Sequence, residues 1–329
     1  MLLSVRELTK KTNKKSVLIF LQHARDEDVE VRVPAIRESV SNIICFVFLG
    51  NEEWIHEIVV LSKGIIDYFL IDSDFKRRNS QSIKRSIEQE AKKALIQFSY
   101  YSDYSSWAAS AVNFLLTMDI DTYKKRIMLV GKNPLATRVV EEMIFRQLDV
   151  YLLQEEYESM EMPLDAASMV TLDSPFVHVL PLNDMRNVGE FHVLLGCAQQ
   201  GNDSMIQKLK DMHFEIAFDI GIRNFPLDYI REHKKNGTRF YRSDDRAGIA
   251  GMVINVMETE YLIKNNLAKT KIGDINIVSG GYMGDCGDIV VDNANDPSVI
   301  LGIAAGDGTF KTCLSEKDVE NKMKIESLL

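Results

Sequence analysis

Short apolar segments alternate with longer amphipathic segments along the first third of the chain. Three of the apolar segments are rich in β-branched and aromatic side chains, and we predict a strand in each: residues 16–22, 43–49 and 67–72. The segment 80–98 has apolar residues at intervals of four, which predicts one face of a helix: Ile83, Ile87, Ala91 and Leu95. The pattern predicts an α/β domain over residues 1–105.

A second alternation follows a helix-like segment at 105–118. It predicts strands at 126–130, 149–154, 176–180, 191–198 and 215–222. Helices are predicted at 134–148, 203–212 and 247–267. Strands that are apolar almost throughout are typical of a parallel sheet with helices on both faces. We therefore predict a second α/β domain over residues 106–268.

The last segment, residues 269–329, has a different pattern. Short β-like runs alternate there with Gly, Asp and Asn turns, which predicts antiparallel hairpins. The predicted fold is a two-domain α/β protein with a parallel sheet of the Rossmann type and a β-rich carboxy-terminal extension.

The loop after the 126–130 strand is the first candidate site. Gly131 can provide the tight turn that a phosphate-binding loop needs, and Lys132 and Asn133 can donate hydrogen bonds. Pro134 suits the first helical turn, whereas Thr137 stands where a second glycine is usual. The loop is either a nucleotide loop or an ordinary corner between a strand and a helix.

Other polar residues and glycines follow strands at the edge of the sheet where ligands bind in such folds. Glu155 and its neighbour Glu156 follow the 149–154 strand, where an acid can accept hydrogen bonds from a ribose diol, or is simply solvated. Cys197 lies at the end of one strand, and Asp219 and Gly221 lie at the end of another. Glycines in such loops also serve ordinary turns.

The segments "SAVNFLLTMDIDTYKKRIMLVGKNPLATRVVEEM", "FHVLLGCAQQGN", "FDIGI" and "DDRAGIAGMVINVMET" together resemble the methylenetetrahydrofolate dehydrogenase/cyclohydrolase family. The resemblance extends from about Ser105 to Leu267. It implies a Rossmann-type domain with the diphosphate of a dinucleotide at residues 131–137. It also implies that Cys197 and Asp219 to Gly221 border the nicotinamide.

The departures from this family limit what the resemblance implies. The first domain contains no Tyr-x-x-x-Lys, the catalytic element of the family, so folate chemistry is not implied. Glu155 and Glu156 replace the basic residue that would hold a 2′-phosphate. Acids repel a phosphate, so NAD is expected rather than NADP.

Three residues are candidates for chemistry. Asp103 stands where shikimate-type dehydrogenases carry an Asn-Thr-Asp triplet, so it can orient a substrate or relay a proton, or else cap a helix. Asp244 and Arg246 precede the last long helix, and the guanidinium can hold a substrate carboxylate. The alternative for this second pair is a salt-bridged loop.

Composition excludes several classes of partner. The 329 residues carry a net charge of −9 with no basic face, so nucleic acid is not an expected partner. No apolar run approaches the roughly 20 residues that a membrane span requires. The four cysteines show no metal spacing, nor do the six histidines, which indicates a cytoplasmic protein without a metal site.

The sequence thus predicts an NAD-dependent oxidoreductase. Its substrate would be a small polar metabolite, similar to an amino or hydroxy acid, held in an interdomain cleft. One alternative is a transferase that binds S-adenosylmethionine on the same scaffold, and another is a non-catalytic sensor or assembly protein. The long apolar helices and the β-rich extension predict a homodimer.

Overall fold

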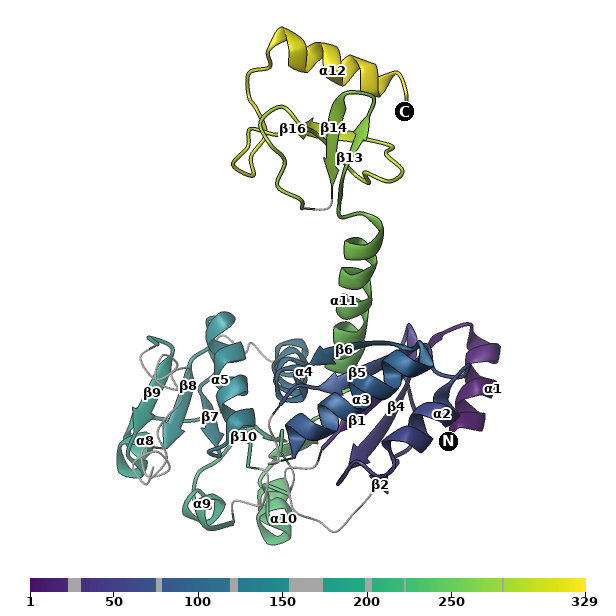
Figure 1. Cartoon of the computed structure of the whole chain (residues 1–329). Coiled ribbons are helices and arrows are strands. Elements are labelled where there is room, and N and C mark those ends of the chain that lie inside the picture. Colours follow the sequence, from purple (N-terminus) through teal and green to yellow (C-terminus); the bar gives the residue numbers. More distant parts are fainter. Residues whose placement is uncertain are drawn as a thin grey trace. The chain divides into compact units, whose positions relative to one another are not determined.

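The computed structural model describes residues 1–22, 31–74, 79–118, 124–153, 174–198, 203–221, 223–279 and 281–329. They form two compact units, Met1–Met252 and Val253–Leu329. The first unit contains two largely parallel sheets, and the second contains a smaller mixed sheet (Figure 1). The predicted fold class, α/β with a Rossmann-type sheet and a β-rich extension, is confirmed. The division into three domains stays a prediction.

The first sheet has four parallel strands in the order β4-β1-β5-β6. Their bounds are β1 Lys15–Leu21, β4 Asn42–Leu49, β5 Tyr68–Asp72 and β6 Gln97–Tyr101. Two short strands, β2 Val31–Arg32 and β3 Arg37–Glu38, pair antiparallel with β4. The central strands are apolar almost throughout because both of their faces are buried.

Three helices pack against this sheet: α1 Leu2–Thr12, α2 Ile55–Ser62 and α3 Ser80–Ala94. Val5, Val59 and Ile87 each bury their side chain in the same core as the strands. Helix α3 is shorter than the predicted 80–98 segment. Leu95 adopts a left-handed conformation with φ 58° and ends the helix, and β6 begins two residues later.

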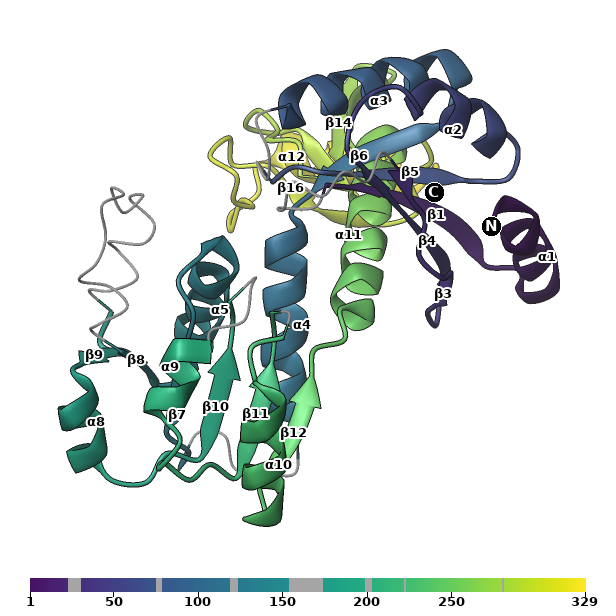
Figure 2. The ribbon, with the colours of Figure 1, turned by 90° about the horizontal axis from the view of Figure 1, so that it is seen from below.

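The second sheet has six strands in the order β12-β11-β10-β7-β8-β9, and every pair is parallel. The strands are β7 Ile127–Val130, β8 Val150–Leu153, β9 Val177–Leu180, β10 Val193–Gly196, β11 Ile216–Asp219 and β12 Arg239–Arg242. Figure 2 shows β10, β11 and β12 pointing the same way. Numbered along the chain, the order is 3-2-1-4-5-6, that of dinucleotide-binding sheets. The direction of winding therefore reverses between β7 and β10.

Among the described residues, five helices connect these strands or flank them: α4 Asp103–Thr117, α5 Pro134–Phe145, α8 Leu182–Val188, α9 Asp203–Lys208 and α10 Leu227–Lys235. Helices α4 and α5 share one hydrophobic core with the sheet. The long helix α11, Arg246–Asn265, begins against α4, where the Gly248 N–H donates to Ser110 Oγ at 2.7 Å. Among the residues described, no helix combines the length and the hydropathy needed to cross a bilayer.

The second unit contains β13 Ala268–Ile272, β14 Ile275–Ser279, β15 Ile289–Val291, β16 Ile300–Ile303 and α12 Glu316–Glu326. Strands β15 and β16 pair antiparallel, as predicted, and β13 and β14 form a further antiparallel hairpin. The prediction of hairpins is wrong for β14 and β15, which pair in parallel. Helix α12 was not predicted; Ser315 and Asp318 cap its start by exchanging hydrogen bonds.

Candidate functional site

Gly131 follows the last residue of β7, at the point where the winding of the sheet reverses. Its φ is +130°, a conformation that residues with a side chain rarely adopt. A Cβ on this residue would lie 2.7 Å from the Ala198 amide nitrogen and 2.8 Å from the Cys197 carbonyl carbon. The loops after β7 and β10 therefore touch backbone to backbone, and only glycine fits between them.

Asn133 joins the same two loops and begins α5. Its Oδ1 accepts a hydrogen bond from the Ala136 N–H at 2.9 Å, which caps the helix, and its Nδ2 donates to the Cys197 carbonyl at 2.7 Å. Thr137 is half-buried and its hydroxyl lies 3.5 Å from the Asn133 carbonyl, whereas Lys132 is exposed.

The first turn of α5 has few donors to offer a ligand. Pro134 has no N–H, and that of Ala136 is bonded to Asn133. A diphosphate here would depend on the amides of Asn133 and Leu135 and on the exposed ammonium of Lys132.

Cys197 contributes no accessible thiol to this edge. Its side chain is fully buried in the core shared by the sheet, α4 and α5. Its N–H donates to the Val130 carbonyl at 2.8 Å, and its carbonyl accepts from Asn133. A ligand could meet Cys197 only through its backbone.

A buried asparagine that the sequence analysis did not single out ties the loop after β10 to the loop after β11. Asn224 is fully buried, and its Oδ1 accepts from the Ala198 N–H at 2.7 Å. Its Nδ2 donates to the Ala198 carbonyl at 3.1 Å and to Asp219 Oδ1 at 2.6 Å. The other oxygen of Asp219 accepts from the Arg223 N–H at 3.1 Å. The carboxylate of Asp219 is thus held within this network.

Two glycines make room for Asn224. A Cβ on Gly196 would lie 2.5 Å from the Cβ of Asn224, and one on Gly221 would lie 2.7 Å from its Nδ2. The Cβ on Gly221 would also collide with the Ala198 carbonyl oxygen. The predicted residues Gly131, Cys197, Asp219 and Gly221 therefore belong to one assembly of three loops.

A second group of polar residues surrounds Tyr101 at the end of β6. The Tyr101 hydroxyl donates to Asp103 Oδ1 at 3.4 Å, and both side chains are buried. Asp103 is the first residue of α4, but the helix cap is Ser102, whose hydroxyl oxygen accepts from the Ser105 N–H. Asp74 fixes this helix start, because its carboxylate accepts from the Ser102 hydroxyl and the Tyr104 N–H.

The charges around Tyr101 are predominantly negative. Burial raises the pKa of Tyr101 well above its usual value, and Asp103 and three other carboxylates add to the effect, those of Asp72, Asp245 and Asp74. Burial also raises the pKa of Asp245, although this residue forms an ion pair with Arg37.

The other predicted site residues are only partly placed. Asp245 is close enough to influence Tyr101, and the predicted Asp244 beside it is exposed. Arg246 begins α11, but its side chain lies outside the described residues, as does the whole of Glu155. The described parts of the chain hold no group of three or more His, Cys, Asp or Glu residues that could bind a metal ion.

No protein-family model matches the sequence, and no curated protein matches it. Among solved structures, the chain is similar to D-lactate dehydrogenase from Escherichia coli, with 11% identity, a TM-score of 0.34 and coverage of 70% of this chain and 89% of that one. The chain is also similar to L-tryptophan dehydrogenase from Nostoc punctiforme, with 11% identity and a TM-score of 0.37; the match covers 66% of this chain and 61% of that one. A third similar structure is ornithine carbamoyltransferase from Campylobacter jejuni, with 7% identity and a TM-score of 0.36; the match covers 71% of this chain and 88% of that one.

Proposed function

We propose that the chain is an NAD-dependent oxidoreductase acting on a small polar metabolite similar to an amino or hydroxy acid. The observation that supports this most directly is the position of Gly131. It follows the first strand of a sheet wound in dinucleotide order, at the reversal point, and its backbone packs against the loop after β10. In open α/β sheets, ligands bind in the crevice at this reversal point.

The residues around Gly131 suit a dinucleotide. The missing side chain lets the loop after β10 pack beside the start of α5, whose positive end favours a diphosphate. In this proposal Lys132, Asn133, Pro134 and Thr137 surround the diphosphate, and Glu155 accepts hydrogen bonds from the ribose. The backbone of Cys197 and the segment from Asp219 to Gly221 border the nicotinamide. Bound NAD would supply the hydride acceptor.

The protein's own contribution is to place the substrate and move a proton. Tyr101 and Asp103 share a hydrogen bond at the start of α4, and we assign Asp103 the role of proton relay. Asp244 and Arg246 lie before and at the start of α11, where the guanidinium would hold a substrate carboxylate.

One observation favours the alternative of a transferase that binds S-adenosylmethionine. Pro134 and the Asn133 cap remove two of the first three N–H groups of α5 from use. A ligand without phosphates would not need them.

Titration calorimetry with NADH, NADPH and S-adenosylmethionine distinguishes these functions. The proposal expects NADH to bind and NADPH to bind more weakly, because Glu155 and Glu156 repel a 2′-phosphate. Binding of S-adenosylmethionine alone would favour the transferase. A chain that binds none of the three would be the sensor or assembly protein, and the oxidoreductase proposal would be wrong.

We also propose a homodimer formed through α11. The carboxy-terminal half of this helix exposes Tyr261, Leu262 and Ile263 by 57%, 48% and 56%. An antiparallel pair with its two-fold axis at Tyr261 would cover the Tyr261 side chain and set Glu258 opposite Lys264 of the partner subunit. Sedimentation equilibrium should show a dimer that Tyr261→Lys dissociates and that Tyr282→Lys, at another exposed tyrosine, does not. A monomeric wild type would contradict this proposal.

A further inference from the structure

The amino-terminal part of the first unit contains a basic hollow of about 400 Å³. Three elements line it: α1, the start of β1 and the segment 64–67 that leads into β5. The lining side chains include four cations and one acid: Arg6, Lys10, Lys14, Lys15 and Asp67. The chain as a whole carries a net charge of −9, so this concentration of positive charge is local.

Helix α1 presents one polar face to the hollow. Arg6 and Lys10 line it four residues apart, which places them on one side of the helix, and Asn13 lines it just past the end of the helix. Val5 holds the opposite side in the core of the sheet, where its side chain is fully buried. The basic face therefore stands on a helix that is fixed in place, rather than on a free terminus.

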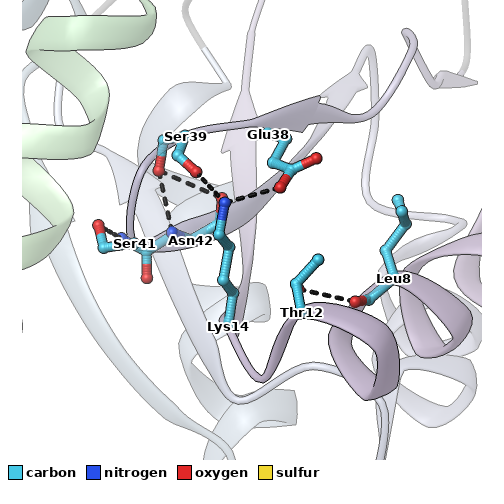
Figure 3. Close-up of polar contacts among 7 residues, drawn as sticks. All are labelled: Leu8, Thr12, Lys14, Glu38, Ser39, Ser41 and Asn42. Carbon is cyan, nitrogen blue, oxygen red and sulfur yellow. Dashed lines mark hydrogen bonds and ion pairs between the residues drawn. The ribbon is translucent and has the colours of Figure 1, made fainter.

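Two of the charged residues in the hollow are engaged elsewhere. The ammonium of Lys14 reaches Glu38 and the Ser39 carbonyl, each at 2.6 Å (Figure 3). Asp67 Oδ2 accepts from both the N–H and the hydroxyl of Ser16, each at 2.8 Å. These contacts fix the rim of the hollow. Glu38 offsets the charge of Lys14, and the remaining cations, Arg6, Lys10 and Lys15, outnumber Asp67.

Of these three, only Lys15 faces an acid, at 3.7 Å from Asp67. Within the described part of the chain, no ion pair involves Arg6 or Lys10. Like charges four residues apart on a helix destabilise it by a few tenths of a kcal/mol. An anion placed between Arg6, Lys10 and Lys15 would attract all three cations and offset the repulsion between them.

We propose that this hollow binds a small molecule bearing a phosphoryl group. An arginine fork that can contact two phosphate oxygens, with two ammonium groups beside it, suits a dianion better than a single carboxylate. The volume falls within the usual range for small-molecule sites. The site lies where β1 begins, in a different sheet from Gly131, so it is independent of the proposed cofactor site.

Titration calorimetry with pyrophosphate tests this site, with the double variant Arg6→Ser, Lys10→Ser and the control Lys11→Ser. Lys11 is exposed on the same helix and does not line the hollow. We expect wild type and control to bind alike and the double variant to bind roughly 100-fold more weakly, about tenfold for each lost charged contact. Circular dichroism would verify that all three chains are folded.

The variant Gly131→Ala distinguishes pyrophosphate binding in the hollow from binding at the loop after β7. Pyrophosphate binding that survives Gly131→Ala and fails in the double variant supports the hollow. Binding that fails in Gly131→Ala and survives in the double variant would assign the anion to the cofactor loop and overturn the proposal. An absence of pyrophosphate binding by the wild type would overturn it as well.

Discussion

Asn224 pairs with Ala198 as a neighbouring strand would, accepting from its N–H at 2.7 Å and donating to its carbonyl at 3.1 Å. A side-chain amide thus continues the pairing of β10 and β11 beyond the last residues of these strands. The loop after β10 is thereby fixed against Gly131 on one side and against Gly221 on the other.

Replacing Asn224 by alanine should destabilise the protein by about 2–4 kcal/mol, because two half-buried backbone groups of Ala198 and one carboxylate oxygen of Asp219 each lose a hydrogen-bond partner. Urea unfolding followed by circular dichroism measures this change. Asn236→Ala is the control, at an exposed position after α10, and should stay within about 0.5 kcal/mol of wild type. Equal stabilities of the two variants would refute the role of Asn224.

Replacing two glycines of α11 by alanine should change the stability of the protein in opposite directions. A Cβ on Gly248 would lie 2.6 Å from Ser110 Oγ and closer still to the Ser106 carbonyl, so Gly248→Ala should destabilise the packing of α11 on α4 by about 1–3 kcal/mol. A Cβ on Gly251 would meet nothing within 4 Å. Gly251→Ala should therefore stabilise the helix by about 0.5–1 kcal/mol. Thermal unfolding of both variants measures the difference, and a stabilising Gly248→Ala would show that the two helices do not pack closely.

His233 should make the protein less stable at mildly acidic pH. The residue is 3% exposed and stacks on Tyr229 with 4.0 Å between ring centroids, and burial lowers its pKa. Between this lowered pKa and the unfolded value of about 6.5, the unfolded chain binds more protons. The free energy of unfolding therefore decreases as the pH falls from about 6.5 towards the pKa of His233 in the folded protein. Above pH 6.5, His233 causes no such decrease.

The variant His233→Phe keeps a stacked ring and removes the titration. Its free energy of unfolding, measured with urea at pH 5 and pH 8, should fall less on acidification than that of wild type. Tyr229 should stay buried in both proteins, which near-ultraviolet circular dichroism would check. The same pH dependence in wild type and variant would mean that His233 does not titrate in this window.

Much of the fold could be predicted because the buried strands are continuous apolar runs. Strands β1, β4 and β5 are apolar for this reason, and the prediction placed all three. The end of α3 could not be placed, because the apolar face of the helix continues to Leu95. A leucine with positive φ does not have the glycine that usually marks a helix end. The parallel pairing of β14 and β15 depends on contacts across the second unit, which local turn residues do not encode.

The candidate site could be predicted only in part. The strand, the glycine and the helix start around Gly131 are neighbours in sequence, so the pattern shows them together. Asn133 and Asn224 also bond to Cys197 and Ala198, which lie 64 and 26 residues away, and these contacts follow only from the order of the strands. A buried Asn224 has no periodic signal in the sequence. Nor does the sequence distinguish Asp245, which pairs with Arg37, from the adjacent Asp244.

The most direct test of the central claim compares NADH binding by Gly131→Ala and Gly237→Ala. Both glycines have positive φ, +130° and +93°, so both substitutions strain the backbone, but a Cβ on Gly237 meets nothing within 4 Å. We expect Gly131→Ala to lose at least tenfold in NADH affinity, about 1.4 kcal/mol, while Gly237→Ala binds as wild type does. Unchanged NADH affinity in a folded Gly131→Ala variant would show that the loop after β7 does not bind the dinucleotide.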